Sequence, residues 1–168
     1  MGIFKMNQPH IRFRHPEFED GAAVYQLIKS SPPLDVNSQY YYHILCSDFC
    51  DTCVIAEIDN RIAGFLSAYL KPRDENCLFV WQVVVSGEAR GRGLASNMLE
   101  WLFKQPKCTH IKCLETTISP SNQASQRLFR RFAEMRGAEC LTSPFLDVSH
   151  FGEDIHEDEI LFRISPLD

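Results

Sequence analysis

The feature that most constrains this fold is a change of hydrophobic pattern halfway along the chain. Residues 52–58 and 62–71 are apolar segments separated by a short polar turn, a pattern that predicts a β-hairpin. A strong strand is expected over 77–85, and after it helix-like and strand-like segments alternate. Hairpins followed by strand–helix–strand–helix predict an α+β (α/β) domain with a mixed central β-sheet flanked by helices.

Hydrophobic periodicity also sets the other expected elements. Helices are predicted over 19–29, 38–49, 93–103 and 122–135. Asn37 and Asn122 are expected to open the second and fourth helices, and Leu128, Phe132 and Met135 are expected to face inward. Further strands are predicted over 111–118, weakly over 139–142, and over 159–164, with a loop over 144–158. Because no internal repeat or linker is evident, residues 1–168 are expected to form one domain, with its core over about 10–165.

Composition narrows the class of protein. The chain has 168 residues, of which 45% are hydrophobic and 23% charged, which is the balance of a globular protein with a real core. No apolar run approaches the roughly 20 residues of a membrane span. Residues 1–14 lack the apolar stretch of a signal peptide. We therefore expect a cytoplasmic protein that does not bind a membrane.

The net charge of −5 is concentrated near the C-terminus. Residues 147–168 hold seven acids and one base, whereas residues 1–146 carry a net charge of +1. The acidic excess argues against nucleic-acid binding, which needs a basic face. The acidic segment is either a solvated surface or a wall that attracts a cationic ligand.

The seven cysteines do not predict a disulfide framework, because their number is odd and no secretion signal is present. Cys46, Cys50 and Cys53 have the spacing of some iron–sulfur motifs. However, the chain is too short for the large barrels of such enzymes, and Cys46 and Cys53 continue apolar stretches, as buried cysteines do. No cysteines pair with histidines at zinc spacing, so no metal is expected.

A basic, glycine-containing loop predicts a phosphate site. Residues 90–95, Arg-Gly-Arg-Gly-Leu-Ala, lie between the strong strand and a helix. Glycines let several backbone N–H groups point the same way, the helix N-terminus adds partial positive charge, and Arg90 and Arg92 add full charges. The alternative is a basic surface turn. No Gly-Lys-Ser/Thr follows, and no dinucleotide fingerprint fits.

These residues resemble a known family. Arg90-x-x-Gly93-x-Ala95 after Val83-Val84-Val85 is similar to the pyrophosphate-binding motif of the GCN5-related N-acetyltransferases, and Asn122 opening a helix is similar to their next motif. The resemblance implies that fold, with acetyl-CoA as cosubstrate and a splay between the central strand and the next strand. The cofactor-binding residues it implies are Val83, Val85, Arg90, Gly91, Arg92, Gly93, Leu94, Ala95, Asn122 and Ser125.

A closer resemblance is to the diaminobutyrate acetyltransferases within that family. It rests on segments 31–38, 79–83, 114–117, 119–122 and 156–159, most of them outside the generic motif. It implies acetylation of the 4-amino group of L-2,4-diaminobutyrate in ectoine biosynthesis, by direct transfer in a ternary complex. It also implies a homodimer. Acetylation of another small amine or of a protein amine, and a non-catalytic acetyl-CoA-binding module, remain as alternatives.

The chemistry requires a group that deprotonates an alkyl ammonium, whose pKa is roughly 10. Glu115 is the first candidate, as base or as substrate ligand, because a buried strand carboxylate needs a partner. The alternative is a structural pair with Lys112 or Arg163. His156 is the second candidate, since its pKa lies in the useful range; the alternative is an exposed loop histidine.

Five further residues complete the predicted substrate site: Asp35, Tyr40, Trp81, Thr116 and Asp158. Asp35 could bind an ammonium group or cap a helix. Trp81 could line the amine pocket or pack in the core. Of the successive tyrosines at 40–42, at most one or two can reach a pocket.

Two roles follow from the family resemblance alone. The backbone N–H of Val83 is the implied donor to the oxyanion of the tetrahedral intermediate. Phe129 occupies the position where the family often has a tyrosine that protonates the leaving thiolate. This departure implies that water or another side chain supplies that proton.

Overall fold

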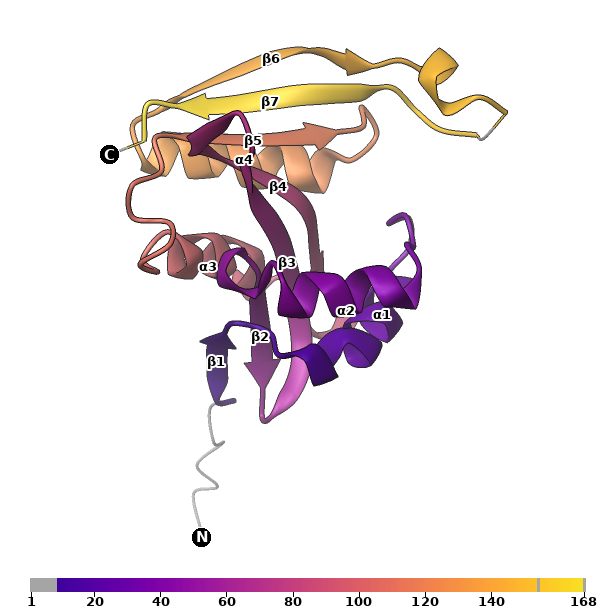
Figure 1. Ribbon diagram of the computed structural model, residues 1–168, viewed down its shortest axis with the longest axis vertical. Coiled ribbons are helices and arrows are strands. Elements are labelled where there is room, and N and C mark those ends of the chain that lie inside the picture. Colours follow the sequence, from indigo (N-terminus) through magenta and orange to yellow (C-terminus); the bar gives the residue numbers. More distant parts are fainter. Residues whose placement is uncertain (1–8, 154, 168) are drawn as a thin grey trace, which may run out of the picture.

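The computed structural model describes residues 9–153 and 155–167, whose strands form one seven-stranded sheet (Figure 1). The strands, in spatial order, are β1 (Ile11–Arg14), β2 (Val54–Ile58), β3 (Arg61–Lys71), β4 (Asp74–Val85), β5 (Cys113–Ile118), β7 (Glu159–Ser165) and β6 (Glu139–Leu146). The β4–β5 pair is parallel and the other neighbours are antiparallel. The predicted mixed sheet is therefore confirmed.

Four α-helices occur in the described part of the chain: α1 (Gly21–Lys29), α2 (Gln39–Ser47), α3 (Leu94–Leu102) and α4 (Gln123–Met135). Short 3₁₀ helices occupy Phe18–Asp20, Cys50–Thr52, Gly87–Ala89 and Val148–Phe151. Within these described residues, no helix has both the length and the apolar content needed to cross a bilayer.

The sheet separates two hydrophobic cores. On one face, α3 and α4 cover a large core that includes Leu66, Leu114 and Phe162. On the other face, α1 and α2 pack on β2–β4 around Ile55 and Phe65. The second pair of helices covers only part of its face, and the rest, over β5 and β7, is left without a helix (Figure 1). We call this uncovered half the open face.

The cap of α2 differs from the prediction. Ser38, not Asn37, is the N-cap, and its Oγ accepts a hydrogen bond from the Tyr41 N–H at 3.3 Å. The helix therefore begins one residue later than the predicted cap would place it. Asn122 does cap α4, because its Oδ1 accepts from the Ser125 N–H at 3.1 Å.

The α2 cap gives a stability prediction with a matched control. Ser38→Ala should lower the free energy of unfolding by about 1 kcal/mol, because one N-terminal N–H loses its partner. Asn37→Ala should have a clearly smaller effect. Urea unfolding followed by circular dichroism measures both, and a larger cost for Asn37→Ala would contradict the assignment.

Two further expectations about the C-terminal half are wrong. Phe132 is buried and Leu128 packs against the core as expected, but Met135 is 58% exposed, and Phe129 and Ala133 complete the buried stripe of α4. The loop expected from residue 144 begins later, because β6 continues to Leu146. Pairing with β7 extends this strand through Ser143 and Pro144, where the sequence alone favours a loop.

The splay of β4 and β5 positions the site. Their register runs only from Cys77–Cys113 to Phe79–Glu115. Beyond Phe79, β4 continues to Val85 alongside β3, and no described pairing joins it to β5. The opening between the two strands leads to the N-termini of α3 and α4.

Candidate active site

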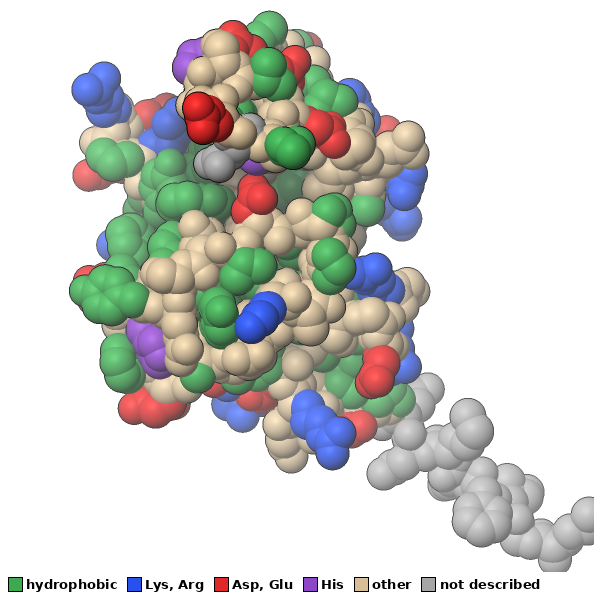
Figure 2. Space-filling model, turned by 90° about the vertical axis from the view of Figure 1, so that its right-hand side faces the viewer, with side chains coloured by type: hydrophobic (Ala, Val, Ile, Leu, Met, Phe, Trp, Pro, Cys, Tyr) green, Lys and Arg blue, Asp and Glu red, His purple; other side chains and the backbone are tan. Residues whose placement is uncertain are grey.

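A cleft of about 580 Å³ lies at this opening. It is bounded by the end of β4, the loop before α3, the start of α4 and residues Ser31–Leu34 of the α1–α2 loop. Every residue predicted to bind the cofactor lines it except Arg92, which is exposed outside it. In space-filling view, the molecule is hollowed between the α1–α2 side and the β6–β7 side, with acidic side chains at the margin (Figure 2).

The glycine loop adopts the conformation that an anion site needs. Gly91 and Gly93 have φ values of 76° and 73°, in the left-handed region that other residues rarely adopt. A Cβ at Gly91 would meet nothing within 4 Å, so backbone conformation, not crowding, requires this glycine. Gly93 is the N-cap of α3, and the helix N-terminus favours a phosphate there.

Sequence reasoning missed two cations of this cleft. Arg127 and Arg131, one helical turn apart on α4, line it opposite the glycine loop, where Arg90 also lies. Arg127 and Arg131 are four residues apart on a helix that Asn122 caps, so they share one helix face. This spacing is the sequence signal that could have identified them. Three arginines around a cleft of this size fit a long polyanion that carries several phosphates.

The Val83 amide points toward the cleft. Gln82 donates its backbone N–H to Ser67 Oγ on β3 at 3.2 Å. Successive N–H groups of a strand point to opposite edges, so the Val83 N–H faces the edge from which β5 has diverged. Val83 also lines the cleft. A register shift opposite Ser67 and Ala68 disrupts regular pairing just before this position.

Glu115, the first candidate for the base or substrate ligand, lies between two cations in the structure. Its side chain is 4% exposed, and its two oxygens accept hydrogen bonds from Lys71 and Arg163. Although burial opposes ionisation, these two cations hold the pKa of the carboxyl below its ordinary value, which makes it a weak base. Glu115 does not line the cleft. The structural alternative fits, with Arg163 as expected and Lys71 in place of Lys112.

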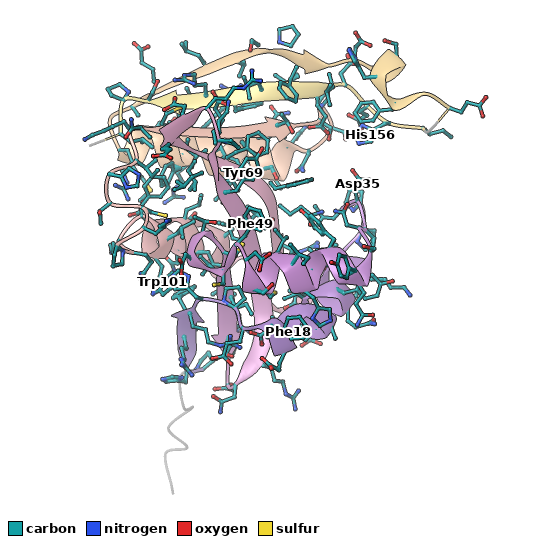
Figure 3. All side chains as sticks on the ribbon, in the orientation of Figure 1. Phe18, Asp35, Phe49, Tyr69, Trp101 and His156 are labelled. Carbon is teal, nitrogen blue, oxygen red and sulfur yellow. The ribbon has the colours of Figure 1, made fainter. Side chains whose placement is uncertain are left out.

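A second group of ionisable side chains lies across the opening. His156 Nε2 is 3.2 Å from Asp35 Oδ2 and 4.0 Å from Glu159 Oε1. Asp35, from the loop before α2, and His156, from the segment before β7, point toward each other and bring the two sides of the molecule into contact (Figure 3). The His156 ring stacks on Phe151 with centroids 3.9 Å apart. We call Asp35, His156 and Glu159 the histidine–carboxylate cluster.

The pKa values of two members of this cluster, His156 and Glu159, are raised. The pKa of His156 is raised, first because its Nδ1–H donates to the Glu157 carbonyl at 2.6 Å, and also because Asp35 favours the imidazolium. The pKa of Glu159 is raised by burial, which outweighs its hydrogen bond with Thr117. Glu159 was expected only as the first residue of a strand, so sequence reasoning missed it.

The Asp35 loop is fixed to the central strand. Gln82 Nε2 donates to the Asp35 carbonyl at 2.8 Å, and the Tyr42 hydroxyl donates to Gln82 Oε1 at 3.3 Å. Gln82 is 7% exposed. A buried amide inside the apolar segment 79–85 was the sequence signal for this link. It places one wall of the cluster relative to the cleft.

Two acids that follow His156 in sequence hold the segment before β7 in place. Asp158 Oδ1 accepts from the Val148 N–H at 3.1 Å, and Glu157 accepts from the backbone and the hydroxyl of Ser121. The structure therefore places Asp158 in loop closure and not beside His156. Asp154 and Asp168 of the acidic segment, and residues 1–8 of the predicted domain, lie outside the described residues.

The three remaining predicted substrate residues, Trp81, Tyr40 and Thr116, do not form one cluster. Trp81 of β4 is 50% exposed, and its ring centroid is 5.2 Å from that of Tyr41 on α2. Tyr40 is 75% exposed. Thr116 is buried on the α4 side of β5, the side of Leu114, whereas Thr117 is on the other side and bonds to Glu159. Tyr41 is thus the tyrosine whose ring contacts Trp81, and Thr117 is the threonine that bonds to Glu159.

Neither the cysteine cluster nor Phe129 adds a reactive group to the site. Cys46 and Cys53 are buried, and burial raises the pKa of each to about 12, in agreement with a packing role. Phe129 is 2% exposed within the α4 core and does not line the cleft. The side chain of Phe129, where the family often has a tyrosine acid, therefore points into the core and away from the opening.

Comparison with known proteins was made by sequence and by structure. Residues 21–133 match the model of the Acetyltransferase (GNAT) family. The chain is 48% identical over 155 residues to the L-2,4-diaminobutyric acid acetyltransferase of Bordetella parapertussis, covering 92% of this chain and 83% of that protein. It is 42% identical over 155 residues to the enzyme of the same name from Halomonas elongata, covering 92% and 80%.

A solved structure is similar over nearly the whole fold. The diaminobutyrate acetyltransferase EctA from Paenibacillus lautus, in complex with its substrate L-2,4-diaminobutyric acid and coenzyme A, aligns with a TM-score of 0.92 at 42% identity. The alignment covers 94% of this chain and 96% of that one.

Proposed function

The chain belongs to the GNAT acetyltransferase family, and from this premise we propose that it transfers the acetyl group of acetyl-CoA to the 4-amino group of L-2,4-diaminobutyrate. The product is N4-acetyl-L-2,4-diaminobutyrate, an intermediate of ectoine biosynthesis. The relatives with these names span nearly all of this chain, which supports the same reaction here.

One observation carries the proposal: a cleft for a polyanion and an acidic cluster are neighbours, because Leu34 and Val83 line the cleft while Asp35, the next residue after Leu34, is held by Gln82 and belongs to the cluster. The cleft offers the α3 N-terminus and arginines 90, 127 and 131 to the phosphates of acetyl-CoA. The cluster offers the carboxylates of Asp35 and Glu159. L-2,4-diaminobutyrate carries two ammonium groups and one carboxylate, so its net charge suits that cluster.

The chain's own groups account for direct transfer in a ternary complex. The amine loses its proton, attacks the thioester carbonyl and forms a tetrahedral intermediate, whose oxyanion the Val83 N–H can stabilise. The C–S bond then breaks and the CoA thiolate takes up a proton. Because a thiol has a pKa of about 8.5, it leaves readily without an acid at Phe129.

His156 is the proposed proton acceptor, and its pairing predicts the pH dependence. While it is protonated, it occupies Asp35 and cannot accept a proton. Its pKa is raised above the ordinary 6.5. The contact with Asp35 is therefore complete below pH 6.5 and is lost as the pH rises through the folded-state pKa. Deprotonation frees Asp35 for the substrate and makes His156 a base.

We therefore expect kcat/KM for the diamine to rise with pH through an ionisation above about 6.5, and His156→Asn to remove that ionisation. Steady-state rates of CoA release between pH 5.5 and about 9.5 measure this. An unchanged pH profile in His156→Asn, with rates near those of the parent, would exclude His156 as the acceptor.

The regiochemistry is tested by identifying the product. Proton and carbon NMR of the product from 2,4-diaminobutyrate should show the acetyl group on the 4-nitrogen. The 2-amino group is less basic and easier to deprotonate, so selectivity for the 4-amino group must come from positioning. Equal acetylation of both nitrogens would refute the proposed orientation.

We also propose a cytoplasmic homodimer. All seven cysteines are free thiols, as expected in a reducing compartment. Phe145, Val148 and Ile155, on and beyond the end of β6, are each more than half exposed, and a second copy would cover such side chains. Light scattering should give twice the chain mass of 19.3 kDa; a monomer would contradict this.

A further inference from the structure

Two of the seven cysteines lie side by side at the parallel junction of the sheet. Cys77 of β4 and Cys113 of β5 are register partners, and their Sγ atoms and a carboxylate oxygen of Glu115 all lie within 4.8 Å of one another. Adjacent strands are about 4.8 Å apart, inside the roughly 4.4–6.8 Å between Cα atoms that a disulfide accepts. Both cysteines are free thiols.

The surroundings of the pair favour one thiolate shared by two sulfur atoms. Arg163, from β7, lowers the pKa of both thiols, whereas burial and Glu115 raise it. The two thiols share a hydrogen bond, which favours a single thiolate between them. Cys113 is 4% exposed and Cys77 is fully buried, so Cys113 is the sulfur that an oxidant reaches first.

The same charges disfavour a metal ion. Both oxygens of Glu115 already accept from Lys71 and Arg163. A divalent cation bound by the two sulfurs and Glu115 would lie beside two positive charges and would have to displace both from the carboxylate. The cluster is better suited to oxidation than to metal binding.

We propose that Cys77 and Cys113 form an oxidation site at which hydrogen peroxide generates a disulfide between β4 and β5. The Cys113 thiolate attacks one peroxide oxygen, the O–O bond breaks, and the released hydroxide takes a proton to leave as water. Cys113 is then a sulfenic acid. The Cys77 sulfur attacks the Cys113 sulfur, the S–O bond breaks and a second water leaves, with the Cys77 proton. Two thiols and one peroxide thus give one disulfide and two waters.

The position of the site limits what the bond would change. Cys77 is fully buried and Cys113 is 4% exposed, so a small neutral oxidant is the appropriate reagent. The bond would form where β4 and β5 are already paired, before the strands diverge toward the cleft. Oxidation is therefore compatible with an open acetyl-CoA cleft.

Peptide mapping of the full chain tests the proposal. The protein is treated with hydrogen peroxide, its remaining thiols are alkylated, and it is digested without reduction for mass spectrometry. The first product should be a peptide linking Cys77 and Cys113, lighter by two hydrogens than the two thiol peptides together. This measurement on the parent chain needs no substitution and so does not depend on how a variant folds.

Variants then assign the two roles. Cys77→Ser should lose the cross-link and accumulate a sulfenic acid at Cys113 that dimedone traps, whereas Cys113→Ser should yield neither product. Cys140→Ser, a control two strands away from Cys113 and on the other face of the sheet, should cross-link as the parent does. Earlier oxidation of Cys46, Cys50 or Cys53 would overturn the proposal. So would stoichiometric zinc binding that protects both thiols, because it would make the pair a metal site.

Discussion

Replacing Glu159 with glutamine should raise the KM for L-2,4-diaminobutyrate about ten- to hundredfold while leaving the KM for acetyl-CoA nearly unchanged. A hydrogen bond to a charged group contributes about 1.5–3 kcal/mol, and each 1.4 kcal/mol corresponds to about tenfold in affinity. Glu159 has an 18% exposed side chain beside His156, where an ammonium group would be largely desolvated. Its amide isostere keeps the shape and removes the charge.

The matched control is Glu153→Gln. Glu153 is an exposed acid of the loop that precedes β7, and it lies outside the histidine–carboxylate cluster. Its substitution makes the same change in net charge and should change either KM by less than about twofold. If both variants raise the diamine KM equally, the cause is the overall negative charge of the acidic segment, and Glu159 makes no specific contact with the diamine. If neither does, the cluster is not the diamine site.

Replacing Glu115 with alanine should produce the largest loss of stability, about 3 kcal/mol, because it leaves two cations without the buried carboxylate that joins them. Their side chains are 36% and 43% exposed for Lys71 and Arg163, which keeps the expected cost at the lower end of the range for broken buried pairs. Glu139→Ala, at an exposed site of the same sheet, should cost less than about 0.5 kcal/mol.

The pKa of Glu115 gives this prediction a pH signature. Its folded-state pKa is below the ordinary 4.5, so its stabilisation is complete above about pH 4.5 and is lost as the pH falls through the folded-state pKa. Urea unfolding of the parent and of Glu115→Ala should therefore converge in acid. A variant that unfolds like the parent but no longer turns over would instead restore Glu115 as a catalytic residue.

Local sequence signals were enough to predict the cleft. A strong apolar strand, two glycines between arginines and an asparagine cap lie close together in sequence, and short-range geometry brings them to one opening. The register of the last two strands could not be predicted, because the end of β6 is held by pairing with β7 and the sequence around Ser143 and Pro144 gives no strand signal of its own. The same long-range pairing decides that Arg163 meets Glu115.

The substrate side of the site was only partly predictable for the same reason. Asp35 and His156 are each recognisable as candidates, but nothing in a separation of 121 positions indicates that they meet. The sequence indicates only that Glu159 begins a strand. Its role in the cluster follows from its position beside His156 in the structure. Thr116 and Thr117 differ only in which face of β5 they occupy, and a one-residue choice reverses that assignment.

The most direct test of the account is a CoA-release assay with L-2,4-diaminobutyrate, ornithine, lysine and a histone peptide at equal concentrations of acetyl-CoA. The histidine–carboxylate cluster and the adjoining cleft predict the highest kcat/KM for L-2,4-diaminobutyrate. A preference for the peptide would contradict the account and assign a protein amine as substrate. No release with any amine, despite binding of CoA, would reduce the protein to an acetyl-CoA-binding module.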